Sequence, residues 1–361
     1  ILNDSLSSSL ALLNQVADLK LIIESSLNEI SDLQKMELGR SLLTREKSIF
    51  RVKSRTDSVY FQGDRNFLLT MGIQDTKVYL QSDWPTLILL LLTFFGLLVA
   101  FIYLRRGHAS ETPEEGQDQW YREKVLARPV ATAFVFTMLL ALWWLPTRPV
   151  FMREIFVILF IIPFLPLFSS LAFKAIRLGL VYLFVLLLYN ILNDYLQSGV
   201  LYLRISSLLE SLALFSFHIY FFLAKKRLDK EKMKSHFFYQ LLNTIQPIYF
   251  FITLLAVVAN IIGYWNYAEL VNEAVLLSLI LLLLFATGFF SLMTVIHYFF
   301  RTKAADRSLV LRESKTGIYK WLLRYLRIGT AILWVYYTMR LFYLWDPFIA
   351  GANKVLDIGY T

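Results

Sequence analysis

The sequence contains no cysteine, few histidines and few charged residues. Its 361 residues include four histidines, and 17% are Asp, Glu, Lys or Arg. Without cysteine the chain cannot form disulfides, use a thiol nucleophile or bind a metal through thiolates. The histidines at positions 108, 218, 236 and 297 have no carboxylate or second histidine at metal-ligand spacing. The sequence therefore predicts no metal and no cofactor.

Catalytic motifs are also missing. The chain has no GxxxxGK[ST] phosphate loop, no GxSxG nucleophile elbow and no set of kinase motifs. The net charge of +9 comes from basic residues that lie mainly between hydrophobic runs. In that position they indicate membrane topology and contacts with anionic lipids. We therefore expect neither an enzyme nor a nucleic-acid-binding protein.

Hydrophobic runs are abundant. Hydrophobic residues make up 57% of the chain, and the mean hydropathy is +0.55, far from the average of soluble proteins. A helix needs about 20 residues to cross the hydrocarbon of a bilayer. The sequence predicts an all-α, polytopic membrane protein with about eight transmembrane helices. The expected spans are 86–104, 130–145, 155–173, 178–193, 200–224, 237–264, 274–300 and 328–345.

The first 84 residues are more polar. Apolar residues recur there at spacings of three and four with charges between them, which predicts helix over 5–48. A helical hairpin or short helical domain is expected, with a self-associating coiled coil as the alternative. The first span should begin at Ser82-Asp83-Trp84-Pro85, because Asp83 can cap a helix and Pro85 suits its first turn. The expected division is a helical domain 1–84, a membrane region 85–345 and a connector 346–361.

Basic residues are distributed unevenly between the loops. Loops after the odd-numbered spans carry nearly all of them, including the run KKRLDKEKMK at 225–234, whereas the others carry only Arg148, Arg153 and Lys354. The positive-inside rule places the odd-numbered loops in the cytoplasm, and hence the amino-terminal domain and the connector outside. An exported domain ahead of the first span would require a signal peptide before Ile1.

Polar residues inside the predicted spans are candidate functional groups, because placing them there is costly. Glu210 lies near the middle of the fifth span and is expected either to act as a proton relay or to bond a neighbouring helix. Gln240, Asn243 and Gln246 form a polar stripe, which could line a transport path or pack against another helix. Arg340, near the outer end of the last span, can extend to lipid headgroups.

The carboxyl-terminal stretch WDPFIAGANKVLDIGYT, residues 345–361, is the predicted connector. Trp345, Asp346 and Pro347 are expected to end the last long helix at the membrane interface. Gly351 and Gly359 allow backbone bends. Residues 351–361 are expected to form an amphipathic segment on the outer leaflet or, alternatively, an ordinary outer loop.

This arrangement resembles the long members of the bacterial small-conductance mechanosensitive channel (MscS-like) family. The resemblance rests on an exported helical domain, eight spans and the sequence LDIGYT after a WDPF break. In that family the extra outer helices precede a Gly/Ala-rich pore helix and a cytoplasmic β domain. No Gly/Ala-rich pore helix occurs in these 361 residues, so no pore residue is assigned.

The resemblance implies the peripheral, tension-sensing region of a channel that releases ions and small solutes on hypo-osmotic stress. It further implies the bacterial inner membrane, a periplasmic amino-terminal domain, contacts with membrane lipids and a homo-oligomer, usually a heptamer. Two alternatives stay open. The chain could be the membrane sensor of a signalling receptor, or a proton-coupled transporter that uses Glu210 and the stripe from Gln240 to Gln246.

Overall fold

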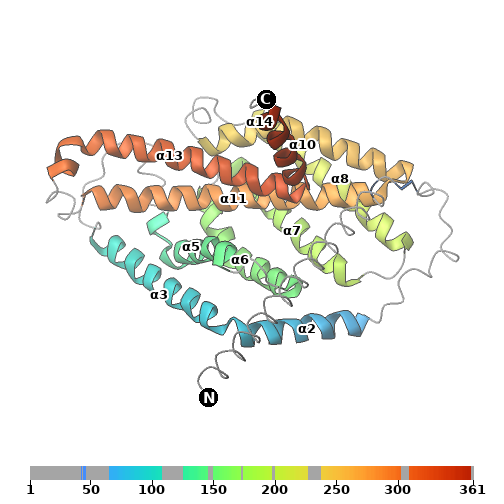
Figure 1. Ribbon diagram of the computed structural model, residues 1–361, viewed down its shortest axis with the longest axis horizontal. Coiled ribbons are helices and arrows are strands. Elements are labelled where there is room, and N and C mark those ends of the chain that lie inside the picture. Colours follow the sequence, from blue (N-terminus) through green and yellow to red (C-terminus); the bar gives the residue numbers. More distant parts are fainter. Residues whose placement is uncertain are drawn as a thin grey trace, which may run out of the picture.

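The computed structural model describes residues 42, 44–45, 65–107, 125–144, 149–171, 174–196, 200–226, 237–301 and 309–358. Every regular element in these ranges is a helix (Figure 1), which confirms the all-α prediction for this part of the chain. The helices are α2 (Arg65–Ser82), α3 (Trp84–Gly107), α5 (Pro129–Trp144), α6 (Val150–Leu171), α7 (Lys174–Leu196), α8 (Val200–Lys226), α10 (Phe237–Ile262), α11 (Trp265–Arg301), α13 (Leu309–Leu341) and α14 (Trp345–Ile358).

Four helices are long and apolar enough to span a membrane, as expected of a membrane protein. They contain Trp84–Arg106, Leu201–Ala224, Gln240–Ile262 and Trp265–His297, and they match the first, fifth, sixth and seventh predicted spans. Shorter apolar helices, Pro129–Ala141, Glu154–Leu167 and Arg177–Asn193, lie where the second to fourth spans are predicted. The eighth predicted span, 328–345, covers the end of α13, the turn after it and the first residue of α14. Helix α13 is not among the apolar helices of the described residues.

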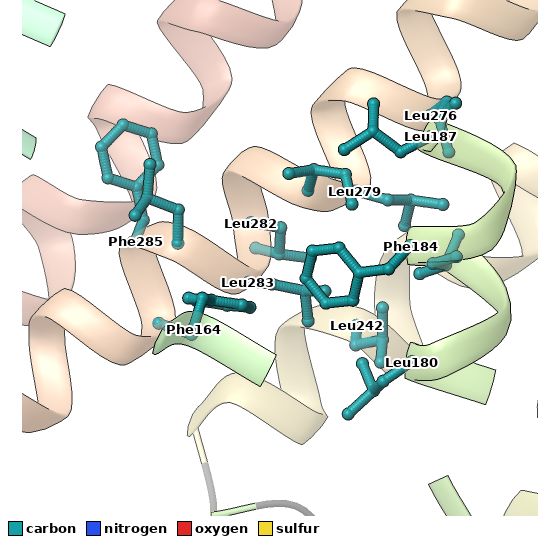
Figure 2. Packing of buried hydrophobic residues seen from close by; sticks show 14 of the residues in the cluster. Phe164, Leu180, Phe184, Leu187, Leu242, Leu276, Leu279, Leu282, Leu283 and Phe285 are labelled. Carbon is teal, nitrogen blue, oxygen red and sulfur yellow. The ribbon is translucent and has the colours of Figure 1, made fainter. Parts of the chain in front are cut away.

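Helix α11 forms the centre of the bundle. It packs against α5, α7, α8, α10 and α13, and its side chains dominate the largest hydrophobic cluster. In Figure 2, Leu276, Leu279 and Leu283 of α11 lie beside Phe184 and Leu187 of α7. From Ala274 onward most described residues of α11 are buried, because a predominantly apolar helical segment has no face that favours water.

Helices α11 and α13 lie side by side along the bundle (Figure 1). They are antiparallel, since Trp334 near the end of α13 donates a hydrogen bond to the carbonyl of Ser278 (3.0 Å). Nearer the other end of the pair, the ring of Tyr319 contacts His297. The beginning of α11 therefore lies next to the end of α13.

The prediction that Trp345, Asp346 and Pro347 break the last long helix is wrong. Helix α13 ends at Leu341, and these three residues begin α14. The break is a Schellman turn: Leu344 N–H donates to Met339 O (2.8 Å), Tyr343 N–H donates to Arg340 O (3.1 Å), and Tyr343 has φ 55°. Pro347 fits the new helix because backbone N–H groups in a first turn have no intrahelical acceptor.

Helix α2 packs against α3 and α6. Its Gly72 lies against Phe151 of α6, where an added Cβ would be 3.2 Å from the Phe151 Cβ. Tyr79 joins Leu90 and Met152 in a second hydrophobic cluster. The chain then turns at Asp83 and enters α3 at Trp84, as the sequence predicted. The helix expected over 5–48 lies almost entirely outside the described residues, as does Gly359.

Candidate functional site

A cluster of polar side chains is buried where α7, α8, α10 and α11 meet. Helix α8 supplies Ser207, Glu210 and Ser211, which have exposed fractions of 4%, 3% and 0%. Asn260 of α10 and Asn272 of α11 are both fully buried. The three α8 positions are three and four residues apart and therefore share one face of the helix. The cluster joins helices that are far apart in the sequence.

The two asparagines converge on one turn of α8. Asn260 donates its amide to Ser207 Oγ (3.0 Å), and Asn272 donates to Ser207 O (3.2 Å) and Ser211 Oγ (2.7 Å). The Ser211 hydroxyl in turn donates to Ser207 O (2.9 Å). Burial strengthens such bonds because water does not compete for the partners. The turn of α8 is therefore fixed against both α10 and α11.

Glu210 faces the neighbouring helix α7. Its Oε1 accepts a hydrogen bond from the Asn190 amide (2.9 Å), and one turn earlier Tyr189 and Ser206 share a hydrogen bond of 2.8 Å. Of the two roles expected for Glu210, this geometry corresponds to a bond with a neighbouring helix. Such a contact aligns α7 with α8 and excludes bulk water from the carboxyl group.

The three polar residues of the predicted stripe on α10 differ in how far they are buried. Gln240 is exposed, Asn243 is half-buried, and Gln246 is buried and donates to the His218 carbonyl (3.0 Å). One turn further on, Tyr249 and Ser278 share a hydrogen bond of 2.8 Å. Gln246, the buried member of the stripe, therefore contacts α8, whereas Gln240 lies at the surface.

The predicted connector residues gather around the start of α14. Trp345 packs edge-on against Tyr336 with ring centroids 4.7 Å apart, and against Phe348 at 6.0 Å. Asp346, Pro347 and Gly351 are exposed. The mixed segment predicted after Trp345 is a regular helix that continues through Gly351 to Ile358, so the outer-loop alternative is wrong for residues 351–358.

Arg340 lies at the end of α13, before the turn to α14. Its Nη1 donates to Tyr336 Oη (3.2 Å), and its guanidinium lies 5.7 Å from the centre of the Tyr336 ring. The side chain is exposed, and its extension towards lipid headgroups stays a prediction. It also lines a cavity of about 500 Å³ that α11, α13 and Leu42 enclose.

The buried cluster has spare acceptor capacity. Asn260 Oδ1 and Asn272 Oδ1 accept no hydrogen bond from the described residues. A buried acceptor without a donor costs about 1–3 kcal/mol, and ordered water commonly fills that role. Among the described residues no group of three His, Cys, Asp or Glu side chains could hold a metal ion. The chemistry that this cluster supports best is hydrogen bonding between helices.

Sequence reasoning identified Glu210 and Gln246 but missed Asn190, Ser207, Asn260 and Asn272. The missed residues carry no charge, and Asn272 lies two residues before the predicted seventh span, which begins at 274. A usable signal was present: each of the predicted fourth to seventh spans carries small or amide residues at positions that face inward. Such residues are typical of helix contacts inside membranes.

Comparison of the chain with protein-family models, curated proteins and solved structures gave no match.

Proposed function

We propose that this chain is the peripheral, tension-sensing transmembrane region of a mechanosensitive channel subunit of the MscS-like type. It would cross the bacterial inner membrane eight times, with the amino-terminal domain in the periplasm and with membrane lipids as its main partners. The subunit would assemble as a homo-oligomer, a heptamer if the resemblance holds. The pore would be supplied by sequence that follows residue 361.

The proposal rests on the contrast between the enclosed helix α11 at the centre of the bundle and the exposed apolar helix α3 at its edge. Helix α11 is enclosed by other helices, whereas α3 exposes apolar side chains along its length, including Leu91, Leu92 and Val99, with exposed fractions of 55%, 63% and 66%. Membrane tension acts on a protein through the difference in its membrane area between two states. A rigid centre edged by lipid-facing helices can transmit such lateral force without losing its own packing.

The joint between α13 and α14 provides a route for that force. Helix α13 is 33 residues long and packs along α11. The Schellman turn at its end redirects the chain into α14, whose Phe348 and Ile349 are exposed. A shift of the α11–α13 pair would therefore move α14 and any element that follows it.

Recording from membrane patches under graded suction tests the proposal. The full-length protein, in cells without their own mechanosensitive channels, should give a conductance that rises with suction. A patch that contains the protein yet shows no pressure-dependent current would contradict a channel function. The reading frame beyond residue 361 gives an independent check, because a Gly/Ala-rich helix followed by a β-rich sequence is expected.

Because Glu210 is buried, a proton-coupled transporter is the second candidate function. A signalling receptor would require catalytic motifs beyond residue 361. The Glu210→Gln variant separates channel from transporter, because it keeps the size of the side chain and an oxygen that can accept from the Asn190 amide. The channel proposal expects unchanged conductance and threshold. A proton-coupled transporter would instead lose uptake, because the replacement cannot exchange a proton. Uptake of radiolabelled solutes into proteoliposomes measures that outcome.

A further inference from the structure

A cavity of about 500 Å³ is lined by the beginning of α11, the end of α13 and Leu42 from the amino-terminal part of the chain. Its size is typical of small-molecule sites, about 300–1,000 Å³. Leu341 and Tyr343, from the end of α13 and the turn after it, also line the cavity. None of the described residues that build the buried cluster around Ser207 lies in its wall. The cavity is therefore a separate feature at the joint between α13 and α14.

The wall that α11 supplies changes from polar to apolar along the helix. Asn266, Glu269 and Glu273 lie on its first turns, and Leu277 and Leu281 follow at the same spacing of three or four residues. These five positions form one stripe, about 22 Å long at the helical rise. One leaflet of a bilayer with its headgroups is about 20–22 Å thick. The stripe thus has the length and the polarity gradient of a single amphiphile.

Charges of both signs stand at the polar end of the cavity. Glu273 of α11 and Arg340 of α13 both line it and are exposed. The contacts of Arg340 with Tyr336 hold the guanidinium at this end. A guanidinium binds phosphate oxygens through paired N–H donors, and a carboxylate accepts hydrogen bonds from an ammonium group. The pair suits a headgroup that carries a phosphate and an ammonium group.

Aromatic residues mark the same level of the bundle. Tyr343 lines the cavity with φ 55°, a backbone conformation that costs a side-chain-bearing residue free energy. Trp265 begins α11, and Trp345 begins α14. The Trp345 ring packs on Tyr336, which Arg340 also contacts. Trp and Tyr are enriched where a membrane protein passes from hydrocarbon to headgroups. The polar end of the cavity therefore lies at headgroup level when α11 spans the membrane.

We propose that this cavity binds one phospholipid whose headgroup carries a phosphate and a primary ammonium group, as in phosphatidylethanolamine. Arg340 binds the phosphate, Glu273 binds the ammonium, and Leu277 and Leu281 contact the acyl chains. The bound lipid also touches Leu341 and Tyr343, so it holds the turn that directs α14. The site deepens the proposed function and rests on it only for the placement of this end of α11 at the outer membrane surface.

Native mass spectrometry of the purified protein tests the site with three lipids of equal chain length. Phosphatidylethanolamine should be retained in preference to phosphatidylcholine, which has the same phosphate and net charge but no N–H donor. It should also be retained in preference to anionic phosphatidylglycerol. Arg340→Gln should lower retention of all three lipids by about two- to fivefold, the effect of removing one exposed charge pair. Equal retention of the three lipids by the unaltered protein would overturn the assignment.

Glu273→Lys is the more decisive variant, because it is expected to gain a preference for a different lipid. With a lysine ammonium and the Arg340 guanidinium at one end of the cavity, the preference should pass to phosphatidylglycerol, a result that a misfolded protein cannot produce. Asp75→Lys on α2 is the matched control, since Asp75 is an exposed carboxylate outside the cavity. The same change of preference in both variants would show a non-specific charge effect and overturn the proposal.

Two further measurements separate a lipid from a soluble ligand. Leu277→Trp fills the apolar end and should abolish retention of every phospholipid, with a monodisperse elution profile showing that the protein is intact. Free phosphoethanolamine should not displace the bound lipid; displacement at equal concentration would overturn the role of the acyl chains. None of these assays requires a pore. Absence of suction-activated current with a preserved lipid preference would therefore count against the channel alone.

Discussion

Helices α3 and α11 are both apolar enough to cross a membrane, yet they occupy opposite positions in the bundle. In their most apolar 18-residue windows, 11% of the residues of α3 and 83% of those of α11 are buried by the rest of the protein. Lipid tails and the interior of a helical bundle are about equally apolar. Hydropathy therefore predicts that each helix leaves water, and it does not say whether lipid or protein surrounds it.

Small and polar residues distinguish the two helices. Asn272, Ser278, Thr287, Ser291 and Thr294 of α11 are all fully buried. In the middle of α3, Thr93 is half-buried and donates to the carbonyl of Leu89 within its own helix (2.7 Å). Small residues let helices approach closely, and polar ones bond across the interface. In an apolar helix, the polar residues therefore indicate better than the apolar ones whether other helices surround it.

Truncating one leucine in each helix gives the largest expected difference. Leu276→Ala in α11 removes a fully buried side chain and should lower the free energy of unfolding by about 2–5 kcal/mol, because it leaves a cavity. Leu92→Ala in α3 removes a side chain that is 63% exposed and should change it by less than about 0.5 kcal/mol. Thermal unfolding in detergent measures both. Equal destabilisation would contradict the central position of α11.

A glycine in each helix extends the comparison to helix packing. A Cβ added at Gly288 of α11 would lie 2.5 Å from Leu139 Cδ1 of α5, whereas one added at Gly96 of α3 would meet nothing within 4 Å. Gly288→Ala should therefore destabilise the fold by about 1 kcal/mol, the low end for overpacking, because only the end of the Leu139 side chain must move. Gly96→Ala should stabilise it by up to about 1 kcal/mol through helix propensity. The same unfolding assay applies, and a stabilising Gly288→Ala would show that α5 does not pack closely on α11.

Local signals in the sequence predicted the helices well. The start of α3 at Trp84 follows from Asp83 and Pro85, whose effects act within one helical turn. The start of α11 was placed nine residues late, at 274 instead of Trp265, because Glu269 and Glu273 interrupt the apolar pattern. The turn after Leu341 was missed because Tyr343 adopts a left-handed conformation that usually requires glycine. The residue after α10 also has a positive φ (117°), and there it is the expected glycine, Gly263.

The buried cluster could be predicted only in part, for a different reason. Glu210 stands out in any apolar span because its charge is costly there. Asn260 and Asn272 become significant only when α10 and α11 bring both amides to Ser207, a meeting that no local pattern encodes. The cavity between α11 and α13 has the same origin, since Glu273 and Arg340 are brought together by the antiparallel pairing of two helices.

The smallest expected difference concerns hydrogen bonds. Asn272→Leu keeps the number and branching of the side-chain heavy atoms but removes the donors to Ser207 O and Ser211 Oγ. Interhelical hydrogen bonds in membrane proteins contribute about 0.6 kcal/mol on average and at most about 1.7, so a loss in this range is expected. Thr93→Val removes a bond that lies within α3 and should be neutral. Thermal unfolding under identical conditions compares the two variants. If both were neutral, the convergence of α8, α10 and α11 on Ser207 would set the alignment of the helices without adding stability.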